Sequence, residues 1–291
     1  MPRRRARSWP ASPPDLMDYR EPVAALMRSV AAAVVAPRFR QLAAHEIAEK
    51  SPGEVVTIVD REAEALLFDG LAAIAPGVRI VGEEAVEHDP DLLDGIGDGA
   101  VWLIDPLDGT ANFAAGKRPF GLMIALVENG EPLAGWLLDP LSDRLCHAAR
   151  GKGATCDGVP VRARPTGKDR PAAALGTHFL QPDHRARVHV HAAQHLDIVP
   201  VPRCAAESYP RLVLGHDDVA LFQRILPWDH AAGVLFLTEA GGCATHWDRT
   251  PYRVGGPGEG VLLGADERLW QVAADVLLMR EGGLIDMEDS I

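Results

Sequence analysis

The sequence predicts an α+β fold in which helices pack on mixed sheets. Segments with helical and with strand-like hydrophobic patterns alternate along the chain. Asn129-Gly130 and Asp157-Gly158 separate strand-like runs, and two-residue turns of this composition join antiparallel strands. Antiparallel hairpins among helices do not fit a simple doubly wound parallel sheet. We therefore expect a layered arrangement.

Length and charge restrict the classes of function. The 291 residues allow one large or two ordinary domains, and 47% hydrophobic with 24% charged residues is typical of a soluble globular protein. The net charge of -12 argues against a nucleic-acid partner, because such binding depends on Lys and Arg that neutralise phosphates. An acidic protein can still bind a small phosphorylated metabolite when metal ions reverse the local field.

The cysteines and the apolar runs suggest a compartment. Cys146, Cys156, Cys204 and Cys243 form no Cys-x-x-Cys pattern, so we interpret them as reduced thiols of a cytoplasmic protein. No apolar run reaches membrane-spanning length, and we expect no membrane partner. The basic, Pro-rich start lacks the apolar stretch of a signal peptide.

We expect two structured halves between two tails. Residues 1–15 are read as a disordered basic tail and residues 283–291 as a frayed tail. A polar, Pro- and Gly-containing segment near residues 162–171 separates an N-terminal α+β half, 16–165, from a C-terminal α/β half, 166–282.

Hydrophobic spacing and turn residues predict the individual elements. In the N-terminal half we expect one or two helices over 16–48, a loop over 50–53, a strand over 55–59, a helix capped by Asp60 and ended by Pro76-Gly77, a strand over 78–81, a mobile acidic loop over 85–99, a strand ending at Asp105, and strands over 121–128 and 133–138. In the C-terminal half we expect strands over 173–176, 198–201, 219–222 and 261–263, and helices over 183–196, 207–214, 230–240 and 267–279.

The stretch from Val101 to Phe113 is the strongest candidate for chemistry. Its apolar run ends at Asp105, and Asp108 follows three residues later on a turn. Two close carboxylates repel each other unless they share a proton or a cation. Mg²⁺ prefers such an all-oxygen environment. A structural turn held by an Asp side chain is the alternative reading of this stretch alone.

Five acidic residues share one context, since each lies at the end of an apolar strand or the start of a helix. They are Asp60, Glu83, Asp105, Asp108 and Asp229. Taken singly, helix caps, turns or a solvated pair explain each of them. Spacing alone does not show that the five converge.

The motifs that contain these residues resemble a known family. Gly82-Glu83-Glu84, the sequence Trp-Leu-Ile-Asp-Pro-Leu-Asp-Gly-Thr-Ala-Asn-Phe over 102–113, and Trp-Asp-His-Ala-Ala-Gly over 228–233 are similar to signatures of the inositol monophosphatase family. Residues 56–60, 151–154 and 238–242 match further elements, in the family's order. The resemblance implies an αβαβα layered sandwich of the sugar-phosphatase type. It also implies a Li⁺-sensitive, homodimeric hydrolase of phosphoric monoester bonds that uses two or three Mg²⁺ ions.

The resemblance also implies a set of metal ligands, most of them in the N-terminal half. Glu83, Asp105 and the Leu107 carbonyl would hold one ion. Asp105, Asp108 and Asp229 would hold a second, with Asp105 bridging the two.

Catalytic and phosphate-binding roles follow from the same resemblance. Asp60 and Thr110 would orient the attacking water, and Glu83 would help to activate it. The backbone N–H groups of Gly109 and Thr110 would bind the phosphate. Two metal ions can bind both the attacking and the leaving oxygen of an in-line displacement, so the physical chemistry agrees.

The substrate region departs from the family pattern. Members that hydrolyse inositol phosphates carry a Glu seven residues before the Trp-Asp aspartate, and here that position is Phe222. Arg203 replaces a Gly ahead of Cys204-Ala205-Ala206. We expect Arg203, Ala205 and Phe222 in the C-terminal half to decide specificity, and a substrate other than myo-inositol phosphate.

Several alternatives stay open. The same scaffold could act as a histidinol-phosphatase, a fructose-1,6-bisphosphatase or a 3′(2′),5′-bisphosphate nucleotidase. A protein of another class, a non-catalytic module that binds metal and phosphorylated ligands, is the more distant alternative. His184, His189, His191 and His195 are interpreted as a solvated helix face and not as a metal site.

Overall fold

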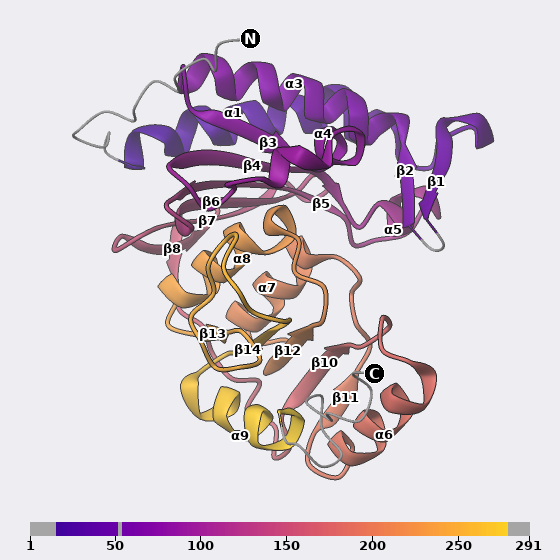
Figure 1. Cartoon of the computed structure of the whole chain (residues 1–291), viewed down its shortest axis with the longest axis vertical. Coiled ribbons are helices and arrows are strands. Elements are labelled where there is room, and N and C mark those ends of the chain that lie inside the picture. Colours follow the sequence, from indigo (N-terminus) through magenta and orange to yellow (C-terminus); the bar gives the residue numbers. More distant parts are fainter. Residues whose placement is uncertain (1–15, 52–53, 279–291) are drawn as a thin grey trace.

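The fold consists of five alternating layers (Figure 1). The computed structural model describes residues 16–51 and 54–278, so both predicted tails, 1–15 and 283–291, lie outside the described part. The layers are helices α1 (Arg20–Val30) and α3 (Ile58–Ile74), a seven-stranded sheet, helices α7 (Ala205–Val213) and α8 (Pro227–Glu239), a five-stranded sheet, and helices α6 (Pro182–Ala192) and α9 (Glu267–Leu277). The expectation of an αβαβα sandwich is confirmed.

The first sheet lies between α1 and α3 on one face and α7 and α8 on the other (Figure 1). Its strands, in spatial order, are β3 (Arg79–Gly82), β4 (Ala100–Asp108), β5 (Gly121–Glu128), β6 (Glu131–Asp139), β7 (Arg144–Ala149), β8 (Gly153–Cys156) and β9 (Val159–Val161). β3 is parallel to β4, and the other neighbours are antiparallel. Alternate residues of β4 therefore enter two cores, Leu103 on the α8 side and Trp102 on the α1 side.

The second sheet is mixed as well. Its strands, in spatial order, are β11 (Asp197–Val199), β10 (Ala172–Gly176), β12 (Val219–Phe222), β14 (Val261–Gly264) and β13 (Cys243–Thr245). β10, β11 and β12 are parallel, and β13 and β14 run antiparallel to their neighbours. The strands and helices expected after residue 172 are all present, with ends that are shifted in every case except the strand over 219–222. β13 is an additional strand that the sequence pattern did not indicate.

Both predicted hairpin turns are confirmed. Asn129 and Gly130 have φ angles of 50° and 78°, and Asp157 and Gly158 have φ angles of 51° and 79°. Two successive residues in the left-handed region match the twist of antiparallel strands, and Asn, Asp and Gly tolerate that region best.

The predicted helix over residues 16–48 is too long. The described helical turns are η1 (Leu16–Tyr19), α1, the π-helical η2 (Ala31–Val35) and α2 (Ala36–Arg38), and a separate 3₁₀ turn η3 covers Ala44–Glu46. Ile47–Ser51 instead forms β1, which pairs with β2 (Glu54–Thr57), so Lys50 and Ser51 are not loop residues. Pairing with β2, which begins three residues after Ser51, overrides the helical preference of the segment. Pro52 and Gly53 lie outside the described residues.

The start of α3 corrects a second expectation. Thr57, not Asp60, is the N-cap, because its hydroxyl accepts the N–H of Val59 at 3.1 Å while the Asp60 carboxylate accepts the N–H of Thr57 at 2.8 Å. This reciprocal capping box makes Ile58 and Val59 the first turn of the helix, although their β-branched side chains suggested a strand.

The expected mobile loop over residues 85–99 is partly helical. It contains most of α4 (Glu83–His88) and the 3₁₀ turn η4 (Pro90–Leu93). The buried Glu64 carboxylate accepts the N–H groups of Glu84 and Ala85, both at 2.8 Å, and so caps α4 from α3. A capping group twenty residues away is not visible as a local sequence signal.

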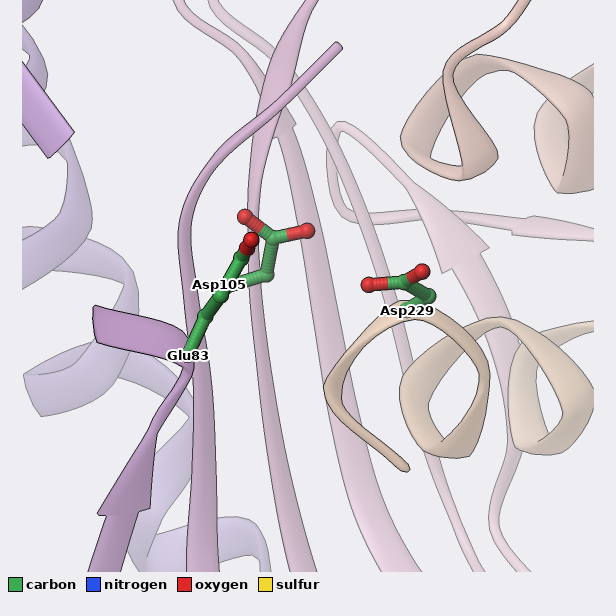
Figure 2. Close-up of side chains that lie close together, drawn as sticks. All are labelled: Glu83, Asp105 and Asp229. Carbon is green, nitrogen blue, oxygen red and sulfur yellow. The ribbon is translucent and has the colours of Figure 1, made fainter. Parts of the chain in front are cut away.

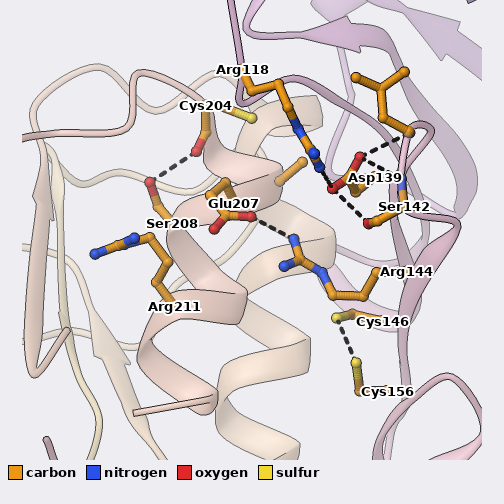
Figure 3. Close-up of polar contacts among 12 residues, drawn as sticks. Arg118, Asp139, Ser142, Arg144, Cys146, Cys156, Cys204, Glu207, Ser208 and Arg211 are labelled. Atoms are coloured by element: carbon orange, nitrogen blue, oxygen red, sulfur yellow. Dashed lines mark hydrogen bonds and ion pairs between the residues drawn. The ribbon is translucent and has the colours of Figure 1, made fainter. Parts of the chain in front are cut away.

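Two observations concern the expectations of reduced thiols and of no membrane-spanning segment. Cys146, Cys156, Cys204 and Cys243 are all free, and the Cys146 and Cys156 sulfurs are 3.8 Å apart (Figure 3). Among residues 16–51 and 54–278, no helix is both long and apolar enough to cross a membrane.

Candidate active site

The register between β3 and β4 places two predicted ligands side by side. Gly82 is the parallel partner of Ile104. Glu83 and Asp105 directly follow these two paired residues, so they lie side by side at the same edge of the sheet. Asp105 is only 2% exposed. Figure 2 shows the two side chains beside each other at the ends of their strands.

Asp229 completes this group from another layer. It lies in the first turn of α8 and faces Glu83 and Asp105 across a short gap (Figure 2). One carboxylate oxygen from each of the three residues lies within 4.8 Å of the others, and among the described residues this is the one group of acidic, His or Cys side chains so arranged. Three converging carboxylates form a donor set of oxygen atoms alone, which suits a hard divalent cation.

Asp108 reaches the same cavity because of a bulge in β4. Asp105 pairs with Met123 and Asp108 with Gly121, so three steps along β4 oppose two steps along β5. Residues three apart point to opposite faces of a regular strand, and one extra residue returns Asp108 to the face of Asp105. Pro106, which cannot donate to a ladder, lies within this irregularity.

A backbone contact then holds Asp108 in place. Its Oδ2 atom accepts the N–H of Ala206, in the first turn of α7, at 2.6 Å. The next residue of α7, Glu207, pairs with Arg144 of β7 at 2.5 Å (Figure 3). These contacts attach the start of α7 to the seven-stranded sheet beside the carboxylates.

The electrostatics of the group favour a cation. Burial, followed by the charges of Glu83 and Asp108, raises the pKa of Asp105 well above its usual range. Burial and the charge of Glu83 likewise raise the pKa of Asp229 well above its usual range. Burial raises the pKa of Glu83 to about 7 although Lys50 opposes the shift. Ionising these groups together is unfavourable unless positive charge joins them.

Asp60 acts on the cavity through Thr110. The Thr110 hydroxyl lies 2.9 Å from Asp60 Oδ1 and 2.8 Å from the Leu107 carbonyl oxygen, while Asp60 Oδ2 accepts the N–H and the hydroxyl of Thr57. Asp60 is 2% exposed, and burial raises its pKa to about 6. Thr110 lines the cavity, and Asp60 lies behind it.

Gly109 fixes the turn that carries Thr110. It has φ 81° and precedes the short helix α5 (Thr110–Ala114). A Cβ atom there would lie 3.0 Å from the Pro119 carbonyl oxygen and 3.2 Å from Cys204 Cβ. Both the left-handed backbone and the close approach therefore require glycine.

The cavity extends from these carboxylates to a second wall. It has a volume of about 360 Å³. The predicted residues Leu107, Asp108, Gly109, Thr110, Arg203, Ala205 and Phe222 all line it, together with Glu83, Asp105 and Asp229. Lining residues that the sequence did not single out for the site include Lys50, His178, Phe179, Gln223 and Arg224.

Lys50 is a site residue that sequence reasoning missed. Its ammonium group lies 2.6 Å from the Glu84 carboxylate and 3.3 Å from that of Glu83. Lys50 belongs to β1, and its partners follow β3, so only the tertiary fold brings them together. No local signal distinguishes it from a surface lysine.

Asn112 is a second such residue, although it stands inside the central motif. Its Nδ2 atom donates to the carbonyl oxygens of Pro119 at 2.8 Å and Pro202 at 3.1 Å. It thereby attaches the segment before Arg203 to the turn that carries Thr110.

His230 supports the second wall instead of binding a ligand. Its Nε2 atom lies 3.1 Å from the Arg224 carbonyl oxygen and its Nδ1 atom 2.9 Å from the Tyr209 hydroxyl. A carbonyl only accepts, so Nε2 carries the proton and Nδ1 accepts from Tyr209. Burial lowers the pKa of His230 to about 4, and the ring stays neutral at pH 7.

The other histidines do not form a common solvated face. His184 is buried, which contradicts that part of the expectation. The His189 ring lies 2.7 Å from the Thr177 hydroxyl, and the rings of His191 and His195 are 5.6 Å apart. Among residues 16–51 and 54–278, these side chains do not gather into a metal-binding group.

Comparisons with known proteins agree with this geometry. The model of the inositol monophosphatase family matches residues 17–278. The chain is 31% identical to Inositol-1-monophosphatase of Bacillus subtilis over 70% of its length and 77% of that protein, and 32% identical to Histidinol-phosphatase of Chlorobaculum parvum over 68% and 74%. The solved Thermotoga maritima IMPase superimposes with a TM-score of 0.74 at 25% identity, covering 89% of this chain and 98% of that one. The chain therefore belongs to the inositol monophosphatase family of phosphomonoester hydrolases.

Proposed function

We propose that the chain hydrolyses a small phosphomonoester in a Mg²⁺-dependent reaction, with two or three ions in each site. The observation that carries the proposal is the convergence of Glu83, Asp105 and Asp229 beside the Thr110–Asp60 pair. Two observations support Mg²⁺ as the ion. The donor set contains oxygen atoms alone, and the raised pKa values of Asp105 and Asp229 show that ionising these carboxylates is unfavourable without a nearby positive charge.

The proposed ligands divide into two groups. Glu83, Asp105 and the Leu107 carbonyl would hold one ion, and Asp105, Asp108 and Asp229 would hold another, with Asp105 shared. When bound, Mg²⁺ lowers the pKa of water and neutralises the charge of the phosphate.

The chain's own residues orient the reactants. A hydroxyl has one proton, and when Thr110 donates it to Asp60 the lone pairs of Thr110 are left to accept a hydrogen bond from the attacking water. Asp60, with a pKa of about 6, accepts a proton readily near neutral pH. The N–H groups of Gly109 and Thr110, at the start of α5, are proposed to donate to phosphate oxygens.

Turnover of glycerol 2-phosphate with and without Mg²⁺ tests this proposal. We expect hydrolysis only with Mg²⁺, and its loss in both Asp105→Asn and Asp229→Asn while the circular dichroism spectrum is unchanged. Hydrolysis independent of Mg²⁺, or none on any phosphomonoester, would instead favour a module that only binds metal and phosphorylated ligands.

We also propose that myo-inositol phosphate is not the preferred substrate. Phe222 lies in the cavity at the position where inositol phosphatases carry Glu, and an apolar ring cannot accept hydrogen bonds from ring hydroxyls. Phosphates of histidinol, fructose and adenosine are alternatives on this scaffold. A kcat/KM for inositol 1-phosphate that equals or exceeds those for the other esters would refute this point.

The remaining family properties stay predictions. A homodimer and inhibition by Li⁺ are expected on the family resemblance, and a cytoplasmic location is expected on the pattern of the cysteines. Light scattering of the purified chain and a Li⁺ titration of its turnover would test two of them directly.

A further inference from the structure

Cys146 and Cys156 face each other on neighbouring strands of the first sheet. They are direct partners in the antiparallel pairing of β7 and β8, and their sulfurs are 3.8 Å apart (Figure 3). Beside this pair, the Asp157 N–H donates to the Leu145 carbonyl oxygen at 2.8 Å. Hydrogen-bonded and non-hydrogen-bonded pairs alternate in such a ladder, so the two cysteines form a non-hydrogen-bonded pair. In such pairs the Cα atoms are about 4.5 Å apart and the side chains lie closest.

We propose that Cys146 and Cys156 are a redox-active dithiol that a hydroperoxide oxidises to a disulfide between β7 and β8. A disulfide needs Cα atoms roughly 4.4–6.8 Å apart and a sulfur–sulfur bond of about 2.05 Å. The facing register meets the first requirement, and the sulfurs need to approach each other by less than about 2 Å to meet the second. Because paired residues of two strands lie on the same face of the sheet, the strands keep their register when the bond forms.

The two thiols have different environments, which assigns the attacking role to Cys156. Cys146 is fully buried in the core on the α7 and α8 side of the sheet. Cys156 ends β8 and is only partly buried, and the residues that follow it, 157–160, are exposed. A hydroperoxide therefore reaches Cys156 from solvent, and Cys146 meets the oxidised sulfur from within the protein.

Hydrogen bonding and charge also favour Cys156 as the nucleophile. Cys146 donates its S–H to Cys156, and this hydrogen bond lowers the pKa of Cys156, although burial and the charge of Asp157 oppose the shift. The charge of Arg144 adds to the lowering. Arg144 lies two residues before Cys146 on the same face of β7 and is therefore diagonal to Cys156, a spacing that long side chains span. The shared hydrogen bond, and then burial, raise the pKa of Cys146, so one sulfur is suited to ionise and the other stays a thiol.

The reaction consumes one hydroperoxide and two thiols. With hydrogen peroxide, the Cys156 thiolate attacks one oxygen, the O–O bond breaks, and Cys156 becomes a sulfenic acid while the other oxygen leaves as water. The Cys146 sulfur then attacks the Cys156 sulfur, the S–O bond breaks, and the remaining oxygen leaves as a second water. The two cysteines lose two electrons and two protons in total, and the peroxide gains them.

This modification site is separate from the candidate active site. Neither Cys146 nor Cys156 lines the cavity that contains the carboxylates. The segment between them contains the turn with Gly151 and Gly153, whose N–H groups donate to the Glu239 carboxylate at the end of α8, both at 2.8 Å. The disulfide would therefore close the hairpin that contacts the end of α8, and its formation does not require phosphatase activity.

Oxidation of the intact chain followed by peptide mapping tests the proposal. The protein, freed of reductant, is treated with a small excess of hydrogen peroxide under non-denaturing conditions. The remaining thiols are then alkylated in denaturant before digestion with trypsin. We expect the free thiols to fall from four to two, and a disulfide to join the peptides Leu145–Arg150 and Gly153–Arg162. Dithiothreitol should separate these peptides again.

Three variants assign the roles of the sulfurs. Cys146→Ser should leave Cys156 as a sulfenic acid that reacts with dimedone, because the thiol that would resolve it is missing. Cys156→Ser should slow the oxidation of Cys146 at least about tenfold, because the remaining thiol is buried. Cys243→Ser changes another partly buried thiol and is the matched control, so it should give the same linked peptides as the wild type.

The wild-type chain alone can overturn the proposal. Four free thiols after peroxide treatment, a disulfide between any other two cysteines, or sulfinic acid at Cys156 with Cys146 still a free thiol would each do so. Thiol counts and peptide masses need no turnover, so failure of the proposed phosphatase function would leave this inference intact, and the reverse also holds.

Discussion

The two walls of the cavity are built in different ways. The acidic wall comes from strand ends and helix starts, with Glu83 and Asp105 placed by the register of β3 and β4 and Asp108 by a bulge. The second wall comes from segments that follow β10 and β12 or precede α7, held by side-chain contacts across long stretches of sequence. Strand geometry thus places residues that are proposed to perform the chemistry. Connecting segments, whose sequences generally vary more than those of strands, place residues that are proposed to determine selectivity.

The strongest test of this contrast is Asp105→Asn. The amide keeps the shape of the side chain but removes the charge that two ions would share, so we expect kcat/KM for glycerol 2-phosphate to fall by roughly 10³-fold or more. Steady-state kinetics at several Mg²⁺ concentrations would measure this, with exposed Asp91→Asn as a matched control. Activity within tenfold of the wild type would show that the acidic wall does not perform the chemistry.

Thr110→Ala should have the next largest effect. We expect kcat to fall by about 10²-fold, because water loses its orienting hydroxyl, while Mg²⁺ affinity changes less than twofold. Calorimetric Mg²⁺ titration beside the kinetics separates these effects, and Thr110→Ser should restore most of the activity. An equal loss of Mg²⁺ binding would show that Thr110 is a ligand after all.

Lys50→Met should produce a smaller change of the opposite kind. The Lys50 ammonium lies 3.3 Å from the Glu83 carboxylate and competes with a cation for it. We expect Mg²⁺ to bind severalfold more tightly at pH 8 once this charge is removed. Calorimetry would detect the change, with exposed Lys152→Met as the control. Weaker binding would mean that Lys50 stabilises the site instead.

His147 of β7 provides a prediction about stability that does not involve either wall of the cavity. Burial, and then the charge of Arg20, lower the pKa of His147 to about 4, below its usual value near 6.5. The unfolded chain therefore takes up the proton first, so stability is present above pH 6.5 and is lost as pH falls toward 4.

The corresponding variant is His147→Gln. Between pH 7.5 and pH 5, this one group should cost the wild type about 2 kcal/mol of unfolding free energy that the variant does not lose. Urea unfolding with EDTA at both pH values measures the difference without metal linkage. Identical pH dependence in the two proteins would show that the acid sensitivity arises from other groups.

Local patterns in the sequence predicted helices layered on mixed sheets and both hairpin turns, whereas the five-layer order was implied by the family resemblance. The local patterns failed where a partner outside the segment decides the structure: Ile47–Ser51 forms a strand because it pairs with the next segment, β2, and Glu64 caps α4 across twenty residues. The start of α3 was also predicted wrongly, although its signal is local. Thr57 and Asp60 have the spacing of a capping box, but the β-branched residues beside Thr57 favoured the prediction of a strand.

The candidate site divides in the same way. Its acidic residues lie in contiguous motifs, so resemblance could indicate them, and the structure brings Glu83, Asp105 and Asp229 together. Lys50, Phe179 and Arg224 could not be found, because each acquires its role from a partner or a cavity formed only in the fold. Arg203 and Phe222 were visible solely as departures from a pattern.

The bulge in β4 decides which face of the strand Asp108 occupies relative to Asp105. In a strand, the count of residues between two side chains, odd or even, decides whether they share a side. Asp105 and Asp108 are three residues apart, so a regular strand would place their side chains on opposite faces. The bulge places them on the same face. A regular strand over the same three steps would keep every carboxylate in the protein and still turn Asp108 away from Asp105, so the bulge is as much a part of the active site as the acids are.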